Sequence, residues 1–172
     1  VSSMKEGHVD IKIAAVVSLP RWESSVARGV IEKALRSFKI PLNAVGGAYW
    51  HHHLQEAMAL YIEDGVDWIL TFDADTFVSD RQLDTLFGVF GSNPHIDALV
   101  PIQCKRHHDT PLATMKGASK VEVTGVPIQI ATGHFGCTLI RSDSLKEVPM
   151  PWFWEKPGPD GSWTHPDRID PD

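Results

Sequence analysis

The chain is most informative at residues 66–75, which read Val66-Asp67-Trp68-Ile69-Leu70-Thr71-Phe72-Asp73-Ala74-Asp75. Most of the first seven residues are β-branched or aromatic, so residues 66–72 predict a strand buried in a sheet. This strand runs directly into two acidic residues. Because residues i and i+2 of an extended segment point to the same side, we expect Asp73 and Asp75 to face one hard cation at the carboxyl edge of the sheet.

The residues before this strand predict two strand-helix units. Residues 11–19 form a nearly continuous apolar run that stops at Pro20, which is typical of a strand buried on both faces. An amphipathic helix over residues 24–38, a short strand near residues 42–45 and a second helix ending at Gly65 follow. The expected buried stripes are Val26, Val30, Ala34 and Phe38 in the first helix and Leu54, Met58, Tyr61 and Ile62 in the second.

The residues after Asp75 predict one more helix and a less regular extension. Ser79-Asp80-Arg81-Gln82 resembles a capping box, and an apolar stripe continues from it to Gly91. Residues 97–103 predict a fourth strand, and residues 120–124, 127–131 and 136–140 predict antiparallel or mixed additions. We therefore expect a single α/β domain over residues 1–172, with a mostly parallel, Rossmann-like sheet, helices on both faces and a short mixed extension.

Composition narrows the partners and the compartment. The formal net charge of -6 argues against a protein that holds nucleic acid by its phosphates. The two cysteines, Cys104 and Cys137, are too few for a disulfide framework, so we expect a reducing, cytoplasmic compartment. Apolar runs are shorter than the roughly 18 residues that cross a bilayer, so no transmembrane segment is expected.

Four segments together resemble one enzyme class. They are Val17-Ser18-Leu19-Pro20-Arg21-Trp22-Glu23, the Gly65-to-Asp75 segment, Thr132-Gly133-His134-Phe135-Gly136-Cys137-Thr138-Leu139-Ile140-Arg141, and Pro151-Trp152-Phe153 ahead of an acidic end. On these segments the chain resembles the GT-A class of glycosyltransferases, near the family-2-like group. The resemblance covers residues 11–172, and the segment that ends in Asp73-Ala74-Asp75 is its most specific part.

The resemblance implies a metal-dependent transferase that moves a sugar from a nucleoside-diphosphate donor to an unknown acceptor. It implies that the nucleotide-sugar site includes Pro20, Arg21, Trp22 and Glu23 near the nucleoside, Asp73 and Ala74 of the acidic motif, and Gly133 and His134 in the segment lining the cleft. Asp73 would face the ribose or the metal, and Asp75 would ligate Mn²⁺ or Mg²⁺. Such a cation neutralises the charge that develops on the departing diphosphate.

The resemblance also implies roles for the end of the chain. Asp170 and Asp172 lie where such families place a catalytic carboxylate that acts as a base or orients the acceptor. Trp152 and Trp154 are expected to border the acceptor cleft, because an aromatic face packs against a sugar. These families continue into a helix and a late histidine ligand, so either the chain is truncated or the third ligand comes from elsewhere, with His165 as the candidate.

Two other functions stay open from the sequence. An apolar strand followed by Asp-x-Asp also begins haloacid-dehalogenase-like phosphatases, in which Asp73 would be the nucleophile. In that class the motif ends the first strand of the domain, and Phe77 stands where Thr or Val is preferred. A non-catalytic nucleotide-sugar-binding domain is the second alternative, and a donor-hydrolysis assay would distinguish it from an active transferase.

Overall fold

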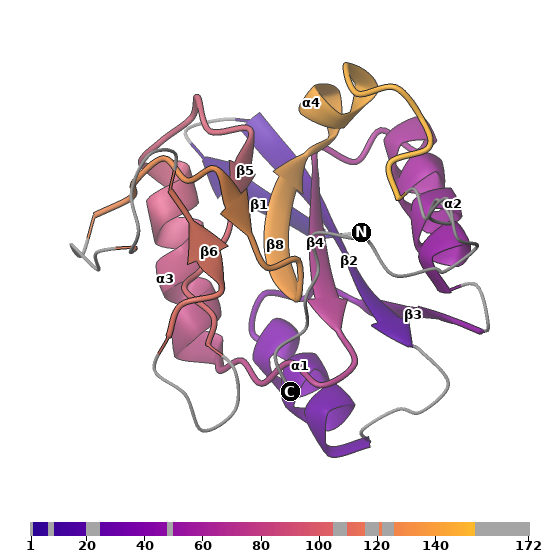
Figure 1. Cartoon of the computed structure of the whole chain (residues 1–172). Coiled ribbons are helices and arrows are strands. Elements are labelled where there is room, and N and C mark those ends of the chain that lie inside the picture. Colours follow the sequence, from indigo (N-terminus) through magenta and orange to yellow (C-terminus); the bar gives the residue numbers. More distant parts are fainter. Residues whose placement is uncertain are drawn as a thin grey trace, which may run out of the picture.

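The computed structural model describes residues 2–6, 9–19, 25–47, 50–104, 110–115, 121 and 126–153. These residues build a mixed six-stranded sheet with helices on both faces (Figure 1). Its strands are β1 (Ser2–Glu6), β2 (Val9–Leu19), β3 (Leu42–Gly46), β4 (Trp68–Asp73), β5 (Ala98–Leu99) and β8 (Cys137–Arg141). The order is β1-β2-β4-β8-β5, and β3 also pairs with β2.

Strand β2 is the centre of the parallel part of the sheet. It pairs in parallel with β3, where Leu19 is opposite Gly46, and with β4, where Ser18 is opposite Asp73. The carboxyl ends of the three strands therefore lie at one edge. The two segments predicted as strands, residues 11–19 and 66–72, thus end on the same side of the sheet, as parallel strands do.

Strand β8 makes the sheet mixed rather than mostly parallel, which corrects the sequence prediction. It lies between β4 and β5 and is antiparallel to both, with Cys137 opposite Phe72 and Leu139 opposite Leu99. Strand β1 is also antiparallel to its neighbour β2. The predicted strand over residues 97–103 is wrong in length, because only Ala98–Leu99 pair with β8 and the chain then leaves the sheet.

A small second sheet lies beside the end of the large sheet that is formed by β8 and β5. It joins β6 (Ala113–Thr114) to β7 (Thr132–Gly133) in antiparallel pairing. The strand predicted over residues 127–131 does not form, and Val126 and Ile128 are exposed, so this apolar segment has no sheet surface to cover. Of residues 120–124, only Val121 is described.

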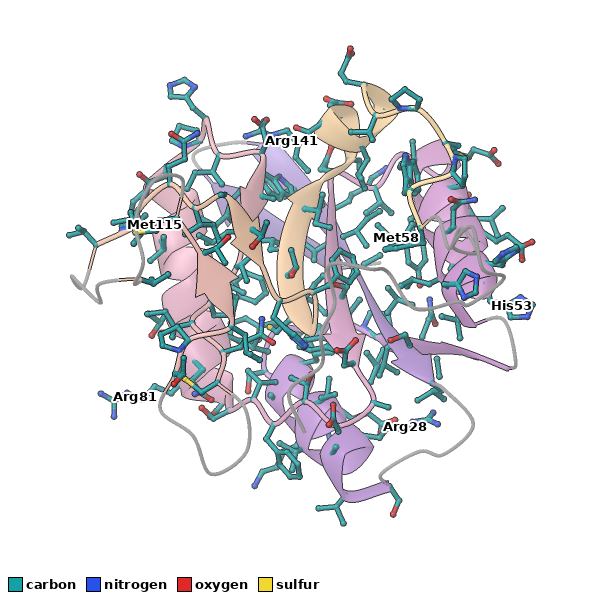
Figure 2. All side chains as sticks on the ribbon, viewed as in Figure 1. Arg28, His53, Met58, Arg81, Met115 and Arg141 are labelled. Carbon is teal, nitrogen blue, oxygen red and sulfur yellow. The ribbon has the colours of Figure 1, made fainter. Side chains whose placement is uncertain are left out.

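Helices cover both faces of the large sheet. On one face α1 (Ser25–Arg36) and α3 (Asp80–Gly91) pack over strand residues such as Leu70 and Phe72. On the other face α2 (Trp50–Glu63) packs over Val16 and Ile69, and the short α4 (Ser142–Lys146) follows β8. Figure 2 shows Met58 of α2 directed toward the sheet and His53 directed away from it. No helix within the described ranges has the length and apolar character needed to cross a membrane.

The helical predictions hold for α2 and α3 but fail in detail for α1. Ser79 caps α3 in a full capping box with Gln82, as predicted. In α1 the buried residues are Ala27, Ile31, Ala34 and Leu35, whereas Val26 is 66% exposed. The predicted buried stripe of α1 is therefore displaced by about one residue, because the helix packs against the sheet with the face that carries the larger Ile31 and Leu35.

Candidate functional site

The acidic pair stands on a turn at the end of β4. Asp73 is the last residue of the strand, and the backbone N–H of Thr76 donates a 3.1 Å hydrogen bond to the carbonyl of Asp73. The expectation of an extended Asp73-Ala74-Asp75 segment is therefore wrong. The turn keeps the two carboxylates near each other all the same, since the negative charge of Asp75 acts on the pKa of Asp73.

Asp73 is held from the β2 side by Ser18. The Ser18 hydroxyl lies 3.3 Å from Oδ1 of Asp73 and donates to it, and the two residues are register partners in the parallel pairing. Ser18 itself is buried, whereas the Asp73 side chain is 34% exposed. The result is a carboxylate with one oxygen fixed by the fold and the other, Oδ2, directed toward the segment before β8.

The segment before β8 closes over the acidic turn. The carbonyl of Gly136 accepts hydrogen bonds from the backbone N–H of Asp73 at 2.9 Å and from the Thr76 hydroxyl at 2.5 Å. His134 lies two residues earlier, and its Nε2 is 3.9 Å from Oδ2 of Asp73. Figure 1 shows the start of β8 beside the tip of β4. The structure thus brings together two segments that are distant in sequence, residues 65–75 and residues 132–141.

Gly136 is what permits this approach. A Cβ at this position would stand 2.8 Å from two ring atoms of His134 and 2.9 Å from Oδ2 of Asp73. These distances are below any normal carbon contact, so a larger residue would displace the imidazole, the carboxylate or both. A glycine here is therefore a requirement of the site's geometry rather than of backbone conformation.

Gln103 holds the segment before β8 in place through side-chain hydrogen bonds. Its Nε2 donates to the carbonyl of His134 at 2.9 Å and to the carbonyl of Cys137 at 3.1 Å. Its Oε1 lies 3.3 Å from Nδ1 of His134. Sequence reasoning assigned no role to Gln103, Ser18 or Thr76, because each reaches the site through a partner far away in the chain. Only Ser18 had a local signal, as a polar residue near the end of an apolar strand.

The electrostatics of Asp73 are set mainly by burial. Desolvation raises the pKa of the Asp73 carboxyl above its ordinary value, and the nearby Asp75 carboxylate raises it further. His134 and the hydrogen bond from Ser18 act in the opposite direction and lower it. The net effect is that the surroundings of Asp73 disfavour the charged form of its carboxyl group.

The other residues predicted for the site differ in burial, and several of them lie outside the described residues. Ala74 is buried, so its side chain faces the protein, whereas Asp75 and His134 are exposed. Gly133 pairs with Ala113 in the small sheet, and a Cβ there would press on Ile130 and Val100. Eight predicted residues or candidates lie outside the described residues: Pro20, Arg21, Trp22, Glu23, Trp154, His165, Asp170 and Asp172.

Trp152 contributes to packing on the α2 side of the sheet. Its ring is partly buried against the cluster that includes Ile140, its Nε1 donates to the carbonyl of Val148 at 3.0 Å, and its backbone N–H donates to Gln55 at 2.7 Å. The next residue, Phe153, stacks edge-on against Phe135 with ring centroids 5.3 Å apart. This contact places residues 152–153 against the segment that carries His134.

The sequence predicts a metal held by Asp73 and Asp75, and the donor set fits a cation that shares its ligands with a substrate. Carboxylate oxygens suit Mg²⁺ and Mn²⁺, which commonly take one or two protein carboxylates plus phosphate oxygens. Within the part of the chain that the structure describes, no three His, Cys, Asp or Glu side chains are grouped closely enough to hold a metal alone. Asp73 and Asp75 would supply a partial coordination shell that a diphosphate completes.

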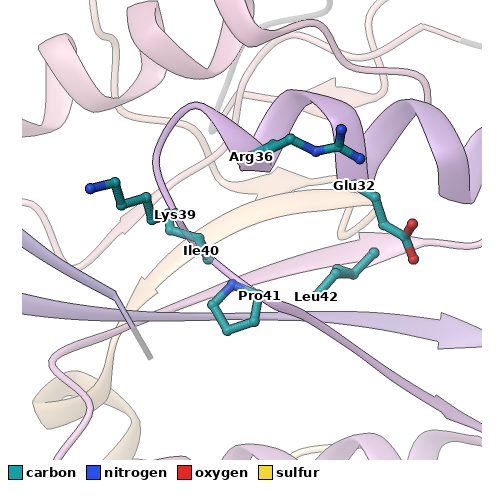
Figure 3. Close-up of a pocket in the computed structure, with 6 residues that line it drawn as sticks. All are labelled: Glu32, Arg36, Lys39, Ile40, Pro41 and Leu42. Carbon is teal, nitrogen blue, oxygen red and sulfur yellow. The ribbon is translucent and has the colours of Figure 1, made fainter.

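A separate hollow of about 580 Å³ lies where α1 leads into β3. Its lining residues are Glu32, Arg36, Lys39, Ile40, Pro41 and Leu42, and none of them belongs to the acidic site. Figure 3 shows the cationic ends of Arg36 and Lys39 extending in different directions rather than toward one point. This hollow is therefore a poor site for a diphosphate, which needs converging donors.

Comparison with known proteins supports the fold. No protein-family model matches the sequence, and no curated protein sequence matches it. The crystal structure of A197 from STIV is similar, with a TM-score of 0.58 and 14% sequence identity over 84% of this chain and 72% of that one. At this level of identity the likeness concerns the α/β arrangement alone.

Proposed function

We propose that this protein is a glycosyltransferase that binds a nucleoside-diphosphate sugar at the carboxyl edge of its sheet, through a divalent cation held by Asp73 and Asp75. The observation that carries the proposal is the meeting of three segments. The acidic turn after β4, the end of β2 at Ser18 and the segment at Gly136 converge, although they are distant in sequence. Ligands of open α/β sheets bind at such an edge.

Each described residue has a separate task in this proposal. Ser18 orients the Asp73 carboxylate by donating to Oδ1, which leaves Oδ2 available to a ligand. Thr76 and the Asp73 backbone hold the carbonyl of Gly136, so the acidic turn and the segment before β8 keep a fixed separation. Asp75, exposed on the turn, is the residue best placed to reach a cation in solvent.

The bound cation would supply the charge that a leaving nucleoside diphosphate requires. Without it, a chain of formal net charge -6 with two neighbouring carboxylates would repel a diphosphate. With it, Asp73 and Asp75 become the anchor for the phosphates. The nucleoside contacts stay with residues 20–23, as the family resemblance indicates. The acceptor contacts stay with Trp152 and Trp154, and the catalytic carboxylate with Asp170 or Asp172.

Calorimetric titration with a panel of nucleoside diphosphates, with and without Mn²⁺, tests the proposal. We expect binding that requires the cation and that weakens at least about tenfold, or about 1.4 kcal/mol, in Asp75→Asn. The matched control is Asp84→Asn, which removes an exposed carboxylate of α3 outside the site. Equal affinity in the wild type and Asp75→Asn would count against the proposal.

Product analysis then distinguishes the alternative functions. A transferase releases free sugar or a glycosylated acceptor from a sugar nucleotide, whereas a binding domain holds the nucleotide without turnover. A haloacid-dehalogenase-like phosphatase would instead release inorganic phosphate from a phosphomonoester and would form a covalent aspartyl phosphate at Asp73. Phosphate release that is lost in Asp73→Asn would replace the transferase proposal with the phosphatase.

A further inference from the structure

We propose that two copies of this chain form a symmetric dimer through β3 and the flank of α2 beside it, so that the large sheet continues from one protomer into the other. The inference does not depend on the proposed function, because it concerns a different margin of the sheet. It rests on two observations: an uncharged strand edge with unpaired backbone groups, and an exposed leucine at the same level above that edge.

The outer side of β3 carries backbone groups that no described strand pairs. Among the described residues, β3 pairs with β2 on one side only. The backbone N–H of Gly47 donates to the carbonyl of Leu19 on β2 at 3.3 Å, and backbone groups alternate in direction along a strand. The N–H and C=O groups of Leu42, Ala44 and Gly46 therefore face outward.

This edge has no charge that would oppose pairing with another strand. It reads Leu42-Asn43-Ala44-Val45-Gly46, with no charged residue and no proline within it. Natural sheet edges are commonly protected from pairing by lysine, proline or a bulge. The polar side chain in this strand, that of Asn43, is occupied on the α2 face, where it donates to the Tyr61 hydroxyl. A second neutral strand therefore fits this edge.

Leu60 lies on the flank of α2 beside this edge. Two ring atoms of His53, Cδ2 and Nε2, lie 3.6 Å from where a Cβ on Gly47 would stand, so the His53 side of α2 is the side next to β3. Leu60 follows His53 by about two helical turns and is on the same side of the helix. Figure 1 shows α2 and β3 together at one margin of the molecule. At this margin Leu60 is 58% exposed.

Leu60 is level with Ala44 along the direction of the strand. Helix α2 runs opposite to β3, because its first turns lie beside Gly47 whereas Tyr61 contacts Asn43. Two helical turns rise about 10.5 Å, and the three residues from Gly47 back to Ala44 span about 10 Å. The exposed leucine and the centre of the unpaired edge therefore lie side by side.

One twofold axis beside Ala44 satisfies both features. Antiparallel pairing of two β3 strands about this axis lets Ala44 exchange two backbone hydrogen bonds with its own copy and places Leu42 opposite the partner's Gly46. Helix α2 packs over both β2 and β3, and neighbouring strands are about 4.8 Å apart. The two copies of α2 are then about 10 Å apart, which is a packing distance for helices. Leu60 meets its copy at the axis, and this symmetry favours a second copy of the chain over an unrelated partner.

Sedimentation velocity over a range of protein concentrations tests the association. We expect the wild type to dimerise below about 1 mM. Leu60→Glu places like charges across the axis, and Ala44→Lys places a lysine at the strand edge, so each should raise the dissociation constant at least about tenfold. The matched control is Ile102→Glu, which adds the same charge at a 56% exposed residue beyond β5, the opposite edge strand. It should dimerise like the wild type, and thermal melts confirm that the variants are folded.

Amide hydrogen exchange tests the geometry of the dimer. The outward N–H groups of Leu42, Ala44 and Gly46 should exchange more slowly as the wild type dimerises, and they should stay fast in Leu60→Glu at the same concentration. A wild type that is monomeric up to about 1 mM would overturn the proposal. A dimer that both Leu60→Glu and Ala44→Lys leave at unchanged affinity, or one that gives Ala44 no added protection, would place the interface elsewhere and overturn it as well.

Discussion

Nε2 of His134 lies 3.9 Å from Oδ2 of Asp73, and a Cβ on Gly136 would stand 2.8 Å from the His134 ring and 2.9 Å from the same Oδ2. The relationship depends on β8 lying directly beside β4, because Cys137 is opposite Phe72 and the preceding residue, Gly136, then meets Asp73 at the acidic turn. The pairing of β8 with β4 therefore holds together both the sheet and the candidate site. A substitution at Gly136 should therefore affect both.

Gly136→Ala should destabilise the fold by about 1–3 kcal/mol, as overpacking usually does, because the new Cβ meets His134 and Asp73 at less than 3.0 Å. The same displacement should weaken Mn²⁺ binding. Urea unfolding and calorimetry measure the two effects. Gly88→Ala is the control, since Gly88 lies in α3 with nothing within 4 Å of its would-be Cβ, and it should be stabilising by up to about 1 kcal/mol. Equal effects of the two substitutions would contradict the crowding at Gly136.

Asp73→Asn should raise stability at neutral pH while removing cation binding. The folded-state pKa of Asp73 is raised above its ordinary value of 3.8, so the protonated form favours folding. That contribution is fully present below the ordinary pKa and is lost as pH rises through the raised one. The variant should thus be more stable than the wild type at pH 7, and the difference should shrink as pH falls through the raised pKa and be smallest below pH 3.8.

Unfolding midpoints across this pH range measure the difference for Asp73→Asn. Carboxyl ¹³C resonances report the Asp73 titration directly. In Asp75→Asn the Asp73 pKa should fall, because a neighbouring negative charge is removed. An Asp73 carboxyl that titrates below its ordinary value in the wild type would show that burial is not the dominant influence.

Ser142→Ala should stabilise the protein by about 1 kcal/mol, raising Tm by about 2–4 °C for a chain of this size. Its hydroxyl is buried and has no hydrogen-bond partner among the described residues, while its backbone N–H still donates to the carbonyl of Asp67. Ser144→Ala is the contrasting variant, because the Ser144 hydroxyl donates to Asp97 at 2.7 Å. Ser144→Ala should be neutral or destabilising, and calorimetric melts that reversed this order would contradict the placement of α4.

The sequence allowed most elements up to Gly91 to be predicted because their signals are local. The apolar run of β2 and the capping box of α3 each lie within a few adjacent residues. The α1 stripe was misplaced because two apolar stripes run side by side there. Val26 and Val30 compete with Ile31 and Leu35, and only the sheet decides between them.

The mixed part of the sheet and most of the site are non-local and could not be predicted in this way. Nothing near residues 137–141 indicates that β8 inserts between β4 and β5. Asp73 and Asp75 were found because a strand leads straight into them. Gln103 and Ser18 act only through partners that tertiary pairing supplies, so their roles became visible with the fold.

The most direct test of the acidic site is a crystal structure with Mn²⁺ and a nucleoside diphosphate, with the metal located by its anomalous scattering. We expect one Mn²⁺ at the carboxyl edge of the sheet, ligated by Asp75 and by Oδ2 of Asp73 and bridging to the diphosphate oxygens. Mn²⁺ and nucleotide bound elsewhere, for example in the hollow lined by Arg36 and Lys39, would contradict it.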